Sequence, residues 1–428
     1  MPASSSSSPS GRSETSCRFC QEQLHLTFVD LGMSPLCESY VRADQLHQME
    51  AFYPLHVYVC ERCHLVQLQQ FVDPKEIFGE YAYFSSYSES WLEHARQYTE
   101  AIVARFGLDE RRSVVELASN DGYLLRNFVA RGIPAFGIEP AANVAEAAIR
   151  QGVPTRVAFF GLALANELVA EGKSADLIVA NNVLAQVPDL NDFVSGMRML
   201  LKSDGVITAE VPHLLRLILE NQFDTIYHEH FSYFSFITIE SIFAAHRLVL
   251  FDVEELPSHG GSLRIYARHE ADTSKVAGDR VHALRDCEVE AGLNRVETYG
   301  RFGEQVKRTK RRLLDFLIDA KQNGKSIAGY GAPGKGNTLL NYCGIRTDFL
   351  DYTVDRNPYK QGKFTPGTHI PILAPEKILE TRPDYVLILP WNLRDEIIRQ
   401  MAVVGRWGGK FVVPIPEVKV LEPAVSSM

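Results

Sequence analysis

Four consecutive residues, Tyr227-His228-Glu229-His230, offer the side chains that a proton-transfer site needs. They combine a phenol, two imidazoles and a carboxylate, and histidine is the side chain whose ordinary pKa lies closest to neutrality. Proton abstraction requires a group whose pKa the protein can adjust toward the working pH. The pattern therefore indicates general acid–base chemistry, and the alternative is a polar loop that happens to be rich in histidine.

Two pairs of cysteines, Cys17-x-x-Cys20 and Cys60-x-x-Cys63, have the spacing of zinc knuckles. Each knuckle presents two thiolates to one point, and two knuckles complete a tetrahedral site. All four ligands are thiolates, so we predict a structural zinc ion with no position open for water. The alternative is four unrelated buried or redox-active thiols.

The composition limits the class of protein. A chain of 428 residues predicts two or three domains, and 46% hydrophobic with 23% charged residues is typical of a soluble globular protein. The net charge of −9 argues against a nucleic-acid binder, and no apolar run is long enough to span a bilayer.

The first sixteen residues are rich in Ser, Pro and Gly and lack the apolar core of a signal peptide. They predict a disordered tail and a cytoplasmic protein, in which cysteines are thiols or metal ligands rather than disulfides. Cys37, Cys287 and Cys343 have no spaced partner, and we expect them to be packed thiols.

The elements that must position these groups form an alternating series. After an amphipathic segment at 91–106, strands are expected at 113–117, 135–139, 177–180, 206–211, 248–253 and 262–267, with helices at 123–130 and 141–151. Alternating strands and helices predict a doubly wound parallel sheet, which binds ligands at the carboxyl ends of its strands.

The turn after the first of these strands has the small residues of a nucleotide site, in ELASNDG, and Glu139 ends the second strand. An acid at that position can accept hydrogen bonds from ribose hydroxyls. Only Gly122 in the turn is glycine, so a purely structural turn is the alternative. Phe159 could cover an adenine face or pack in the core. The residues expected at this cofactor edge are Glu116, Ala118, Asn120, Gly122, Glu139, Pro140, Phe159 and Asn181.

The C-terminal part contains a second glycine-rich turn. Charged helices are expected at about 274–322, and a strand at 326–331 then runs into the G-x-G-x-x-G pattern of residues 329–334. Asp355 ends the next strand, so the pattern taken alone predicts NAD. Lys335 adds a point charge for a phosphate.

The sequence resembles the nucleotide-sugar C-methyltransferases of deoxysugar biosynthesis in four segments and in the spacing of its cysteines. The four segments are ELASNDGYLL, GIEP, ANNVLAQVPD and YHEHFSYFS. The resemblance covers nearly the whole chain after residue 16. It implies S-adenosylmethionine as cofactor and a nucleotide-linked 4-keto-6-deoxysugar, dTDP-linked, as substrate. The implied reaction methylates a carbon beside the C4 ketone, with carbon 3 favoured and carbon 5 open. The G-x-G-x-x-G turn would then bind the nucleotide diphosphate of the sugar.

The resemblance also implies an α/β fold class: a class I methyltransferase sheet flanked by a zinc-binding module and a Rossmann-like domain. We expect a tail at 1–16, the zinc module at 17–86, the S-adenosylmethionine-binding domain at 87–272, a helical connector at 273–322 and the nucleotide-sugar domain at 323–420. Relatives suggest a monomer, and the charge and hydropathy of the chain predict no nucleic-acid or membrane partner.

By resemblance, His230 is the general base, with Glu229 and Tyr227 as helpers. A carbon-bound proton must leave before the methyl group arrives, and a donor must meet the charge that grows on the ketone oxygen. Glu229 is expected to orient the imidazole, Tyr227 to donate to the enolate oxygen, and His228 to face away. Tyr81 matches a functional tyrosine of the family.

The substrate loops complete the prediction. The residues assigned to substrate binding are Tyr83, Asn182, Gln186, His259, Gly260, Ser262, Gly334, Lys335, Asn337 and Asp355. Tyr81 and Tyr83 could instead form a surface aromatic stripe. Gln186 stands where several relatives have His, and an amide can bind but cannot shuttle a proton. Two alternative functions stay open: an NAD-dependent sugar-nucleotide oxidoreductase and a non-catalytic partner of a biosynthetic complex.

Overall fold

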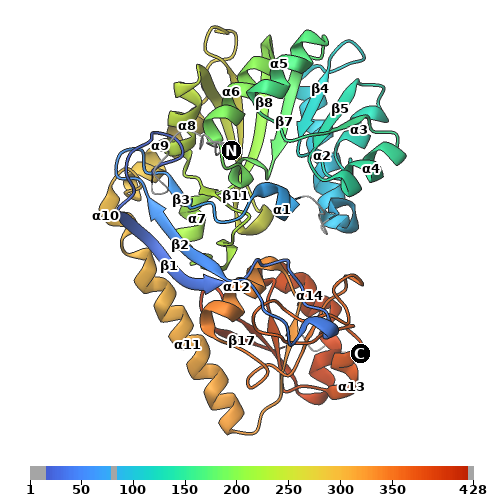
Figure 1. The fold of residues 1–428 in the computed structure, drawn as a ribbon, viewed down its shortest axis with the longest axis vertical. Helices are drawn as coiled ribbons and strands as arrows, with labels where there is room; N and C mark the ends of the chain where they lie inside the picture. Colours follow the sequence, from blue (N-terminus) through green and yellow to red (C-terminus); the bar gives the residue numbers. More distant parts are fainter. Residues whose placement is uncertain (1–15, 79–83, 423–428) are drawn as a thin grey trace, which may run out of the picture.

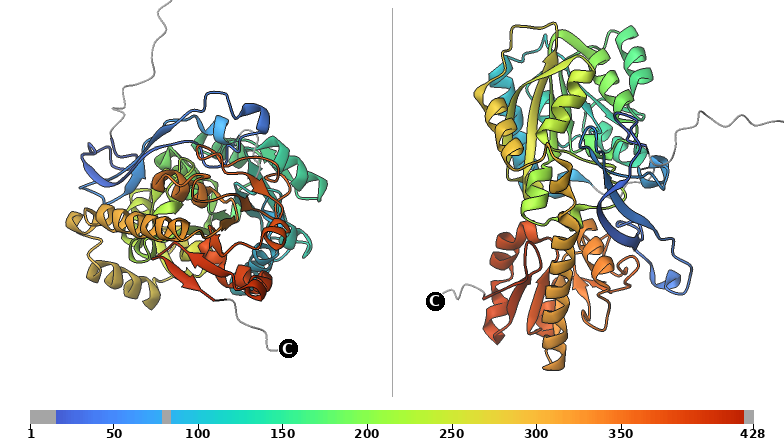
Figure 2. Two further views of the ribbon diagram at one scale, coloured as in Figure 1. Left: turned by 90° about the horizontal axis from the view of Figure 1, so that it is seen from below. Right: turned by 90° about the vertical axis from the view of Figure 1, so that its left-hand side faces the viewer.

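The computed structural model describes residues 16–78 and 84–422 and arranges them around three sheets. Figure 1 shows an upper body built on the middle of the chain and a lower body built on its C-terminal part. The first two strands of the chain run between these bodies, as the side view in Figure 2 also shows. No helix among the described residues is both long and apolar enough to cross a membrane.

The N-terminal sheet is antiparallel and takes its last strand from far along the chain. Its strands, in order, are β1 (Leu26–Ser34), β2 (Tyr53–Val59), β3 (Val66–Leu68) and β9 (Ser232–Tyr233). In the last pair, Ser232 lies opposite Gln67 and Tyr233 opposite Val66. β9 begins two residues after His230, so the N-terminal sheet holds the downstream end of that segment.

The middle sheet confirms the prediction of a doubly wound α/β arrangement. Its order is β10 (Leu248–Leu256), β11 (Ser262–His269), β8 (Leu201–Pro212), β7 (Ala175–Asn181), β4 (Val114–Leu117), β5 (Ala135–Glu139) and β6 (Thr155–Val157). Strands β4 to β8 are parallel, and β11 pairs antiparallel with both neighbours. β7 is buried along its whole length, as expected for a central strand covered on both faces.

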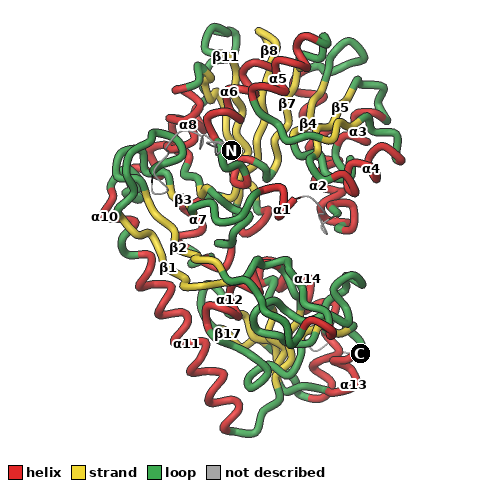
Figure 3. Tube along the Cα trace, viewed as in Figure 1, coloured by secondary structure: helices red, strands yellow, loops and turns green. Residues whose placement is uncertain are grey.

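Helices cover both faces of this sheet (Figure 3). The helices of the middle body are α1 (Pro74–Phe78), α2 (Glu89–Phe106), α3 (Leu125–Val129), α4 (Ala142–Arg150), α5 (Leu162–Ala170), α6 (Leu190–Leu200), α7 (Leu214–Leu219) and α8 (Phe236–Ala245). α2 and α3 share one hydrophobic core with the sheet, and α5, α6 and α8 share another. The carboxyl ends of the parallel strands stay open to a ligand.

The charged stretch after the middle sheet is helical, as predicted. It contains α9 (Asp279–Glu290), α10 (Val296–Tyr299) and α11 (Phe302–Gln322), and α11 borders the lower body in Figure 1. The third sheet has the order β14 (Ile372–Leu373), β13 (Thr353–Val354), β12 (Ile327–Tyr330), β15 (Tyr385–Ile388), β16 (Lys410–Val413) and β17 (Lys419–Leu421), with only β17 antiparallel. Its helices are α12 (Gly334–Cys343), α13 (Lys377–Thr381) and α14 (Arg394–Gln400).

The N-terminal sheet contributes to the cores of both bodies. Phe28 and Leu55 belong to the core of the C-terminal sheet, together with Leu313 of α11. Cys60 and Leu65 belong to a core of the middle sheet. The three sheets are therefore joined through shared apolar packing.

Candidate active site

A cleft of about 700 Å³ is lined by residues of all three parts of the chain. The turns at the carboxyl ends of β4, β5 and β7 form one wall, and the start of α12 with residues 390, 392 and 393 forms the opposite wall. Residues 227, 229 and 230 lie between these walls, and residues 37 and 38 come from the N-terminal part. The cleft therefore has room for a cofactor at one side and a substrate at the other.

Most of the predicted cofactor residues line the first wall: Ala118, Asn120, Glu139, Pro140, Phe159 and Asn181. The Glu139 carboxylate accepts hydrogen bonds from the N–H groups of Asn120 and Ala141, each at 2.9 Å. Burial raises the pKa of Glu139, and these two N–H donors oppose the rise. The carboxylate thus holds the turn after β4 against the end of β5.

The buried side-chain amide of Asn181 indicates that this wall fits a ligand. Its side chain is only 8% exposed, and neither amide atom has a hydrogen-bond partner among the residues that the structure describes. A buried polar group without a partner costs free energy, so a ligand in the cleft is what this amide is suited to bind. The wall fits a polar cofactor on that observation.

Two predicted cofactor residues do not line the cleft. Glu116 lies within β4 and is fully buried, and burial raises the pKa of its carboxyl well above the usual value. Gly122 has φ 78°, and a Cβ there would lie 3.0 Å from Val153 Cγ2. Glu116 therefore belongs to the sheet interior, and Gly122 serves the packing of the turn.

Residues 227–230 form a turn in which the His230 N–H donates to the Tyr227 carbonyl at 2.9 Å. A short 3₁₀ helix, Phe223–Thr225, precedes the turn. On the other side, the Phe231 N–H donates to the Ala185 carbonyl at 2.7 Å before the chain enters β9. Both ends of the turn are therefore fixed.

The His230 ring is held as a neutral base. Its Nδ1 lies 3.0 Å from the Thr225 carbonyl oxygen, and a carbonyl can only accept, so Nδ1 carries the proton and Nε2 is left basic. Burial lowers the pKa of His230 to about 4; the Thr225 bond opposes this shift, and the charges of His259 and Lys335 add to it. The orienting partner is thus the Thr225 carbonyl, whereas the sequence had predicted Glu229.

Tyr227 and Glu229 lie beside this ring in the cleft. The centroid of the Tyr227 ring is 4.2 Å from that of His230, and burial raises the pKa of the phenol well above its usual value. Tyr227 therefore keeps its proton and can act as a donor. The Glu229 carboxylate is buried and accepts a hydrogen bond from the Cys37 thiol, with Sγ 3.7 Å from Oε1.

His228 faces away from the cleft, as expected. Its Nε2 lies 3.2 Å from the Pro54 carbonyl, and its ring meets that of Tyr53 edge-on at 5.8 Å. It packs the turn against β2.

The opposite wall brings together Gly334 and Lys335 at the start of α12. A Cβ at Gly334 would lie 2.9 Å from Cys37 Sγ, so a side chain there would require Cys37 to shift. Lys335 Nζ donates to Asn392 Oδ1 at 2.9 Å and lies 4.7 Å from the centroid of the Trp391 ring. Free N–H groups and the positive end of a helix dipole favour an anion at such a position, and Lys335 adds charge.

Three predicted substrate residues of the middle body also line the cleft: Asn182, Gln186 and His259. Gly260 and Ser262 do not. Gly260 has φ 93°, and a Cβ there would lie 2.7 Å from Trp391 Cη2. The Ser262 hydroxyl is buried and donates to the Ser258 carbonyl at 3.0 Å. Both residues therefore serve packing at the joint between the bodies.

Asn337 and Asp355 were also predicted to bind substrate, and neither lines the cleft. The Asn337 amide donates to the Cys37 carbonyl at 2.6 Å. The two carboxylate oxygens of Asp355 accept the N–H groups of Ala332 at 2.7 Å and Asn357 at 2.8 Å. Asp355 thus closes the glycine-rich turn internally, whereas an NAD site would need this carboxylate for the ribose.

Tyr81 and Tyr83 lie outside the described residues. The segment that follows them is tied to the cofactor turn, because the Ser85 N–H donates to Asn120 Oδ1 at 2.9 Å and the Ser86 N–H donates to Asp121 Oδ2 at 3.2 Å.

Several residues of the site were missed by the sequence analysis. Cys37, Glu38 and Lys360 line the cleft, and Lys360 Nζ lies 3.5 Å from Glu38 Oε2. They come from opposite ends of the chain, and no motif surrounds them. Cys343 is buried as expected, but Cys287 is exposed, so the prediction that it packs was wrong.

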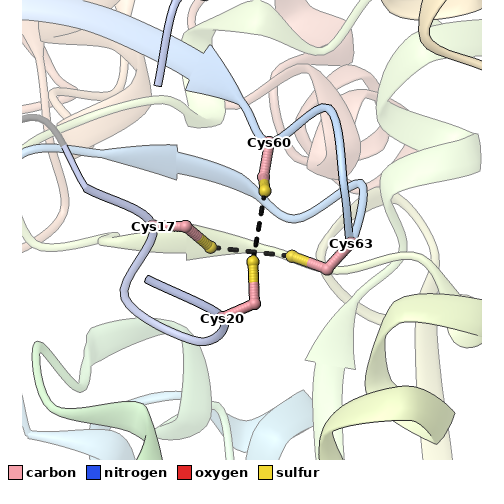
Figure 4. Close-up of side chains that lie close together, drawn as sticks. All are labelled: Cys17, Cys20, Cys60 and Cys63. Carbon is pink, nitrogen blue, oxygen red and sulfur yellow. Dashed lines mark hydrogen bonds between the residues drawn. The ribbon is translucent and has the colours of Figure 1, made fainter. Parts of the chain in front are cut away.

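The four predicted zinc ligands converge on one point (Figure 4). The Sγ atoms of Cys17, Cys20, Cys60 and Cys63 all lie within 4.8 Å of one another. Both knuckles turn in the same way: the N–H groups of residues 21 and 64 donate to the carbonyls of Cys17 and Cys60. Four sulfur ligands around one point are the donor set of a structural zinc ion.

Family models match three stretches of the chain. Their descriptions are "Putative zinc binding domain" for residues 17–78, "Methyltransferase domain" for residues 91–250 and "C-methyltransferase C-terminal domain" for residues 257–416.

A relative, C-methyltransferase NovU from Streptomyces niveus, is 36% identical over 405 residues, which cover 95% of this chain and 96% of NovU. Among solved structures, the chain is similar to a SAM-dependent methyltransferase from Anabaena variabilis, with 14% identity over 40% of this chain and 83% of that one and a TM-score of 0.33. It is also similar to the 1,6-didemethyltoxoflavin-N1-methyltransferase of Burkholderia thailandensis, with 18% identity over 48% and 94% and a TM-score of 0.34.

Proposed function

The chain belongs to the C-methyltransferase family, and from that premise we propose that it methylates a carbon beside the C4 ketone of a nucleotide-linked 4-keto-6-deoxysugar. The protein is an S-adenosylmethionine-dependent C-methyltransferase with a class I methyltransferase fold and a structural zinc site. When bound, the cofactor supplies an electrophilic methyl group. The methylated carbon is carbon 3 or carbon 5, since both flank the ketone.

The geometry of His230 carries this proposal. Its Nε2 is left as the basic atom by the 3.0 Å bond between Nδ1 and the Thr225 carbonyl, in a cleft with one wall for each ligand. Carbon methylation needs such a base, because a proton must leave the carbon first. Tyr227, which keeps its proton, is placed to donate to the oxygen that gains charge.

The two walls support the assignment of the ligands. Glu139, Asn181 and Phe159 face the cofactor, and Asn182 and Gln186 continue this edge toward the substrate. Lys335 and the start of α12 face the nucleotide diphosphate, with Gly334 as the point of closest backbone approach. The sugar then lies between them, next to residues 227–230. We retain Tyr81 as a catalytic residue and Tyr83 as a substrate residue in this proposal.

The family assignment sets aside a non-catalytic role, and the bonded Asp355 carboxylate disfavours an NAD site. Both alternatives had been open from the sequence alone.

The proposal is tested by incubating the protein with S-adenosylmethionine and a set of nucleotide 4-keto-6-deoxysugars in deuterated water. We expect a mass gain of one methylene and solvent exchange at the acidic carbon. His230→Asn keeps an amide donor for the Thr225 carbonyl but removes Nε2. The rates of methylation and of solvent exchange should therefore both fall about 10²- to 10⁴-fold.

The matched control is His228→Asn, since this neighbouring histidine bonds to Pro54 and lies outside the cleft. It should leave both rates within a few-fold of wild type. Exchange that survives His230→Asn would assign proton removal to another residue, and nuclear magnetic resonance of the product identifies the methylated carbon.

A further inference from the structure

The buried Asp224 carboxylate lies at the junction between the base and the opposite wall of the cleft. It belongs to the 3₁₀ helix Phe223–Thr225 and has no exposed surface. Its Oδ2 accepts a hydrogen bond from the Trp391 indole Nε1 at 2.7 Å. The next residue, Thr225, is the one whose carbonyl holds Nδ1 of His230. Asp224 is therefore adjacent in the chain to the residue that holds the His230 ring.

Trp391 lies at the other end of this bond, between two residues of the wall that is proposed to face the nucleotide diphosphate. Its neighbours Pro390 and Asn392 line the cleft. Lys335 Nζ sits 4.7 Å from the centroid of the Trp391 ring and donates to Asn392 Oδ1 at 2.9 Å. The indole is thus packed directly against the charge that is proposed to hold the diphosphate.

The indole of Trp391 is buried and closely packed. The tip of the ring abuts Gly260, where a Cβ would lie 2.7 Å from Cη2. A second link between the Asp224 segment and the opposite wall runs from the Thr338 hydroxyl of α12 to the Ile226 carbonyl at 3.1 Å. Burial raises the pKa of Asp224 to about 7, and the nearby Lys335 charge and the indole bond oppose the rise.

We propose that the Trp391–Asp224 hydrogen bond sets the distance between the diphosphate anchor at Lys335 and the base His230, which makes both residues positioning residues for methyl transfer. Neither side chain needs to touch the substrate. A misplacement of about 1 Å between an anchored substrate and a catalytic group can reduce a rate roughly 100-fold. This inference rests on the proposed function, because it takes Lys335 as the anchor and His230 as the base.

A double-mutant cycle tests the bond itself. Trp391→Phe keeps the ring but removes the N–H donor, and Asp224→Ala removes the acceptor. We expect each change to lower kcat and the solvent-exchange rate about 10- to 100-fold, while the dissociation constant for S-adenosylmethionine stays within twofold. The double variant should be no slower than the slower single variant, because both changes remove the same interaction.

Two further variants serve as controls. Asp224→Asn keeps an oxygen for the indole and should restore most of kcat. Trp407→Phe removes another indole bond of the same sheet, which runs from Nε1 to the Pro383 carbonyl at 3.0 Å and lies outside the cleft, and should leave kcat unchanged. Asp224→Ala could fail to fold. The kcat of Trp391→Phe, compared with those of Asp224→Asn and Trp407→Phe, then still decides whether the Trp391–Asp224 bond matters for methyl transfer.

The outcomes separate the inference from the proposed function. A wild-type protein that methylates none of the ketosugars removes the proposed function and this inference with it. An active wild type whose Trp391→Phe variant keeps kcat within twofold, or whose single effects add in the double variant, removes the inference alone.

Discussion

His230 combines two features that histidine in water lacks: a ring proton fixed on Nδ1 by the Thr225 carbonyl, and a pKa lowered by burial to about 4. The first leaves Nε2 as the basic atom, and the second keeps the ring neutral across the physiological range. A neutral ring is ready to take a proton, although a low pKa makes it a weak base in the free protein. An anion bound beside Lys335 would offset the ammonium charge that helps to lower this pKa.

The titration of His230 in the free protein follows from these contacts. We expect the midpoint of its ring resonance to lie near pH 4, below the ordinary value of about 6.5. Lys335→Met removes a positive charge that lowers this pKa, so it should move the midpoint to higher pH. Nuclear magnetic resonance of carbon-13-labelled histidine, assigned with His230→Asn, measures both midpoints. A wild-type midpoint at or above 6.5 would contradict the account.

Glu139 is the residue on which the cofactor wall depends most directly. Its carboxylate accepts two N–H groups of the chain, and glutamine can accept only with its one amide oxygen. Hydrogen bonds to a charged group contribute about 1.5–3 kcal/mol, so Glu139→Gln should weaken S-adenosylmethionine binding roughly 10- to 100-fold. Titration calorimetry measures the dissociation constant for S-adenosylmethionine. Glu171→Gln is the control, because the Glu171 carboxylate makes only exposed ion pairs. Equal affinities in wild type and Glu139→Gln would exclude this role.

At the scale of elements, the alternation of strands and helices was sufficient to predict the middle sheet and the edge along which the cleft lies. Strand periodicity also located Glu139 and the turn after β4. It did not predict which side chains turn into the cleft: Glu116 points into the sheet, and Asp355 bonds to its own loop. Those directions depend on tertiary contacts that no local pattern contains.

Two features lay beyond the reach of the sequence for a related reason. β9 has only two residues, and its partner β3 lies in the zinc module, so neither length nor periodicity indicates the pairing. Cys37 and Asp224 gain their roles from contacts with Glu229 and Trp391, which are distant in the chain.

The zinc knuckle also contacts segments that form the cleft. Arg18, between two of the ligands, donates to the Pro188 carbonyl at 2.8 Å and to the Leu68 carbonyl, and its guanidinium lies 5.4 Å from the centroid of the Phe231 ring. Pro188 lines the cleft, and Phe231 follows His230. Through one side chain, the knuckle thus contacts a loop that lines the cleft and the residue that follows the proposed base.

Arg18→Lys isolates this link from the metal, because one ammonium cannot replace a planar guanidinium that reaches two carbonyls. We expect kcat to fall about 10-fold while zinc content, measured by mass spectrometry, stays at one ion per chain. Arg62→Lys, in the other knuckle and exposed, is the matched control. If Arg18→Lys keeps full kcat, the knuckle serves only the fold of its own module.

At the scale of the whole molecule, the N-terminal sheet joins two bodies that are proposed to bind different ligands. Phe28 and Leu55 of this sheet enter the core of the C-terminal sheet. Cys60 and Leu65, in the knuckle between β2 and β3, enter a core of the middle sheet. Shared apolar burial couples the unfolding of the parts that share it. The cleft then lies within one cooperative unit, although its walls come from separate sheets.

Calorimetry of the zinc-loaded protein tests this coupling through its ligands. We expect one unfolding transition, which both S-adenosylhomocysteine and dTDP move to higher temperature. A ligand at 100 times its dissociation constant adds about 2.7 kcal/mol to the free energy of unfolding, provided that it binds only the folded state. Thymidine lacks the diphosphate that Lys335 and the start of α12 are proposed to hold, so it should shift the transition less. Independent bodies would instead give two unfolding transitions. S-adenosylhomocysteine would then raise only the transition temperature of the middle sheet, and dTDP only that of the C-terminal sheet.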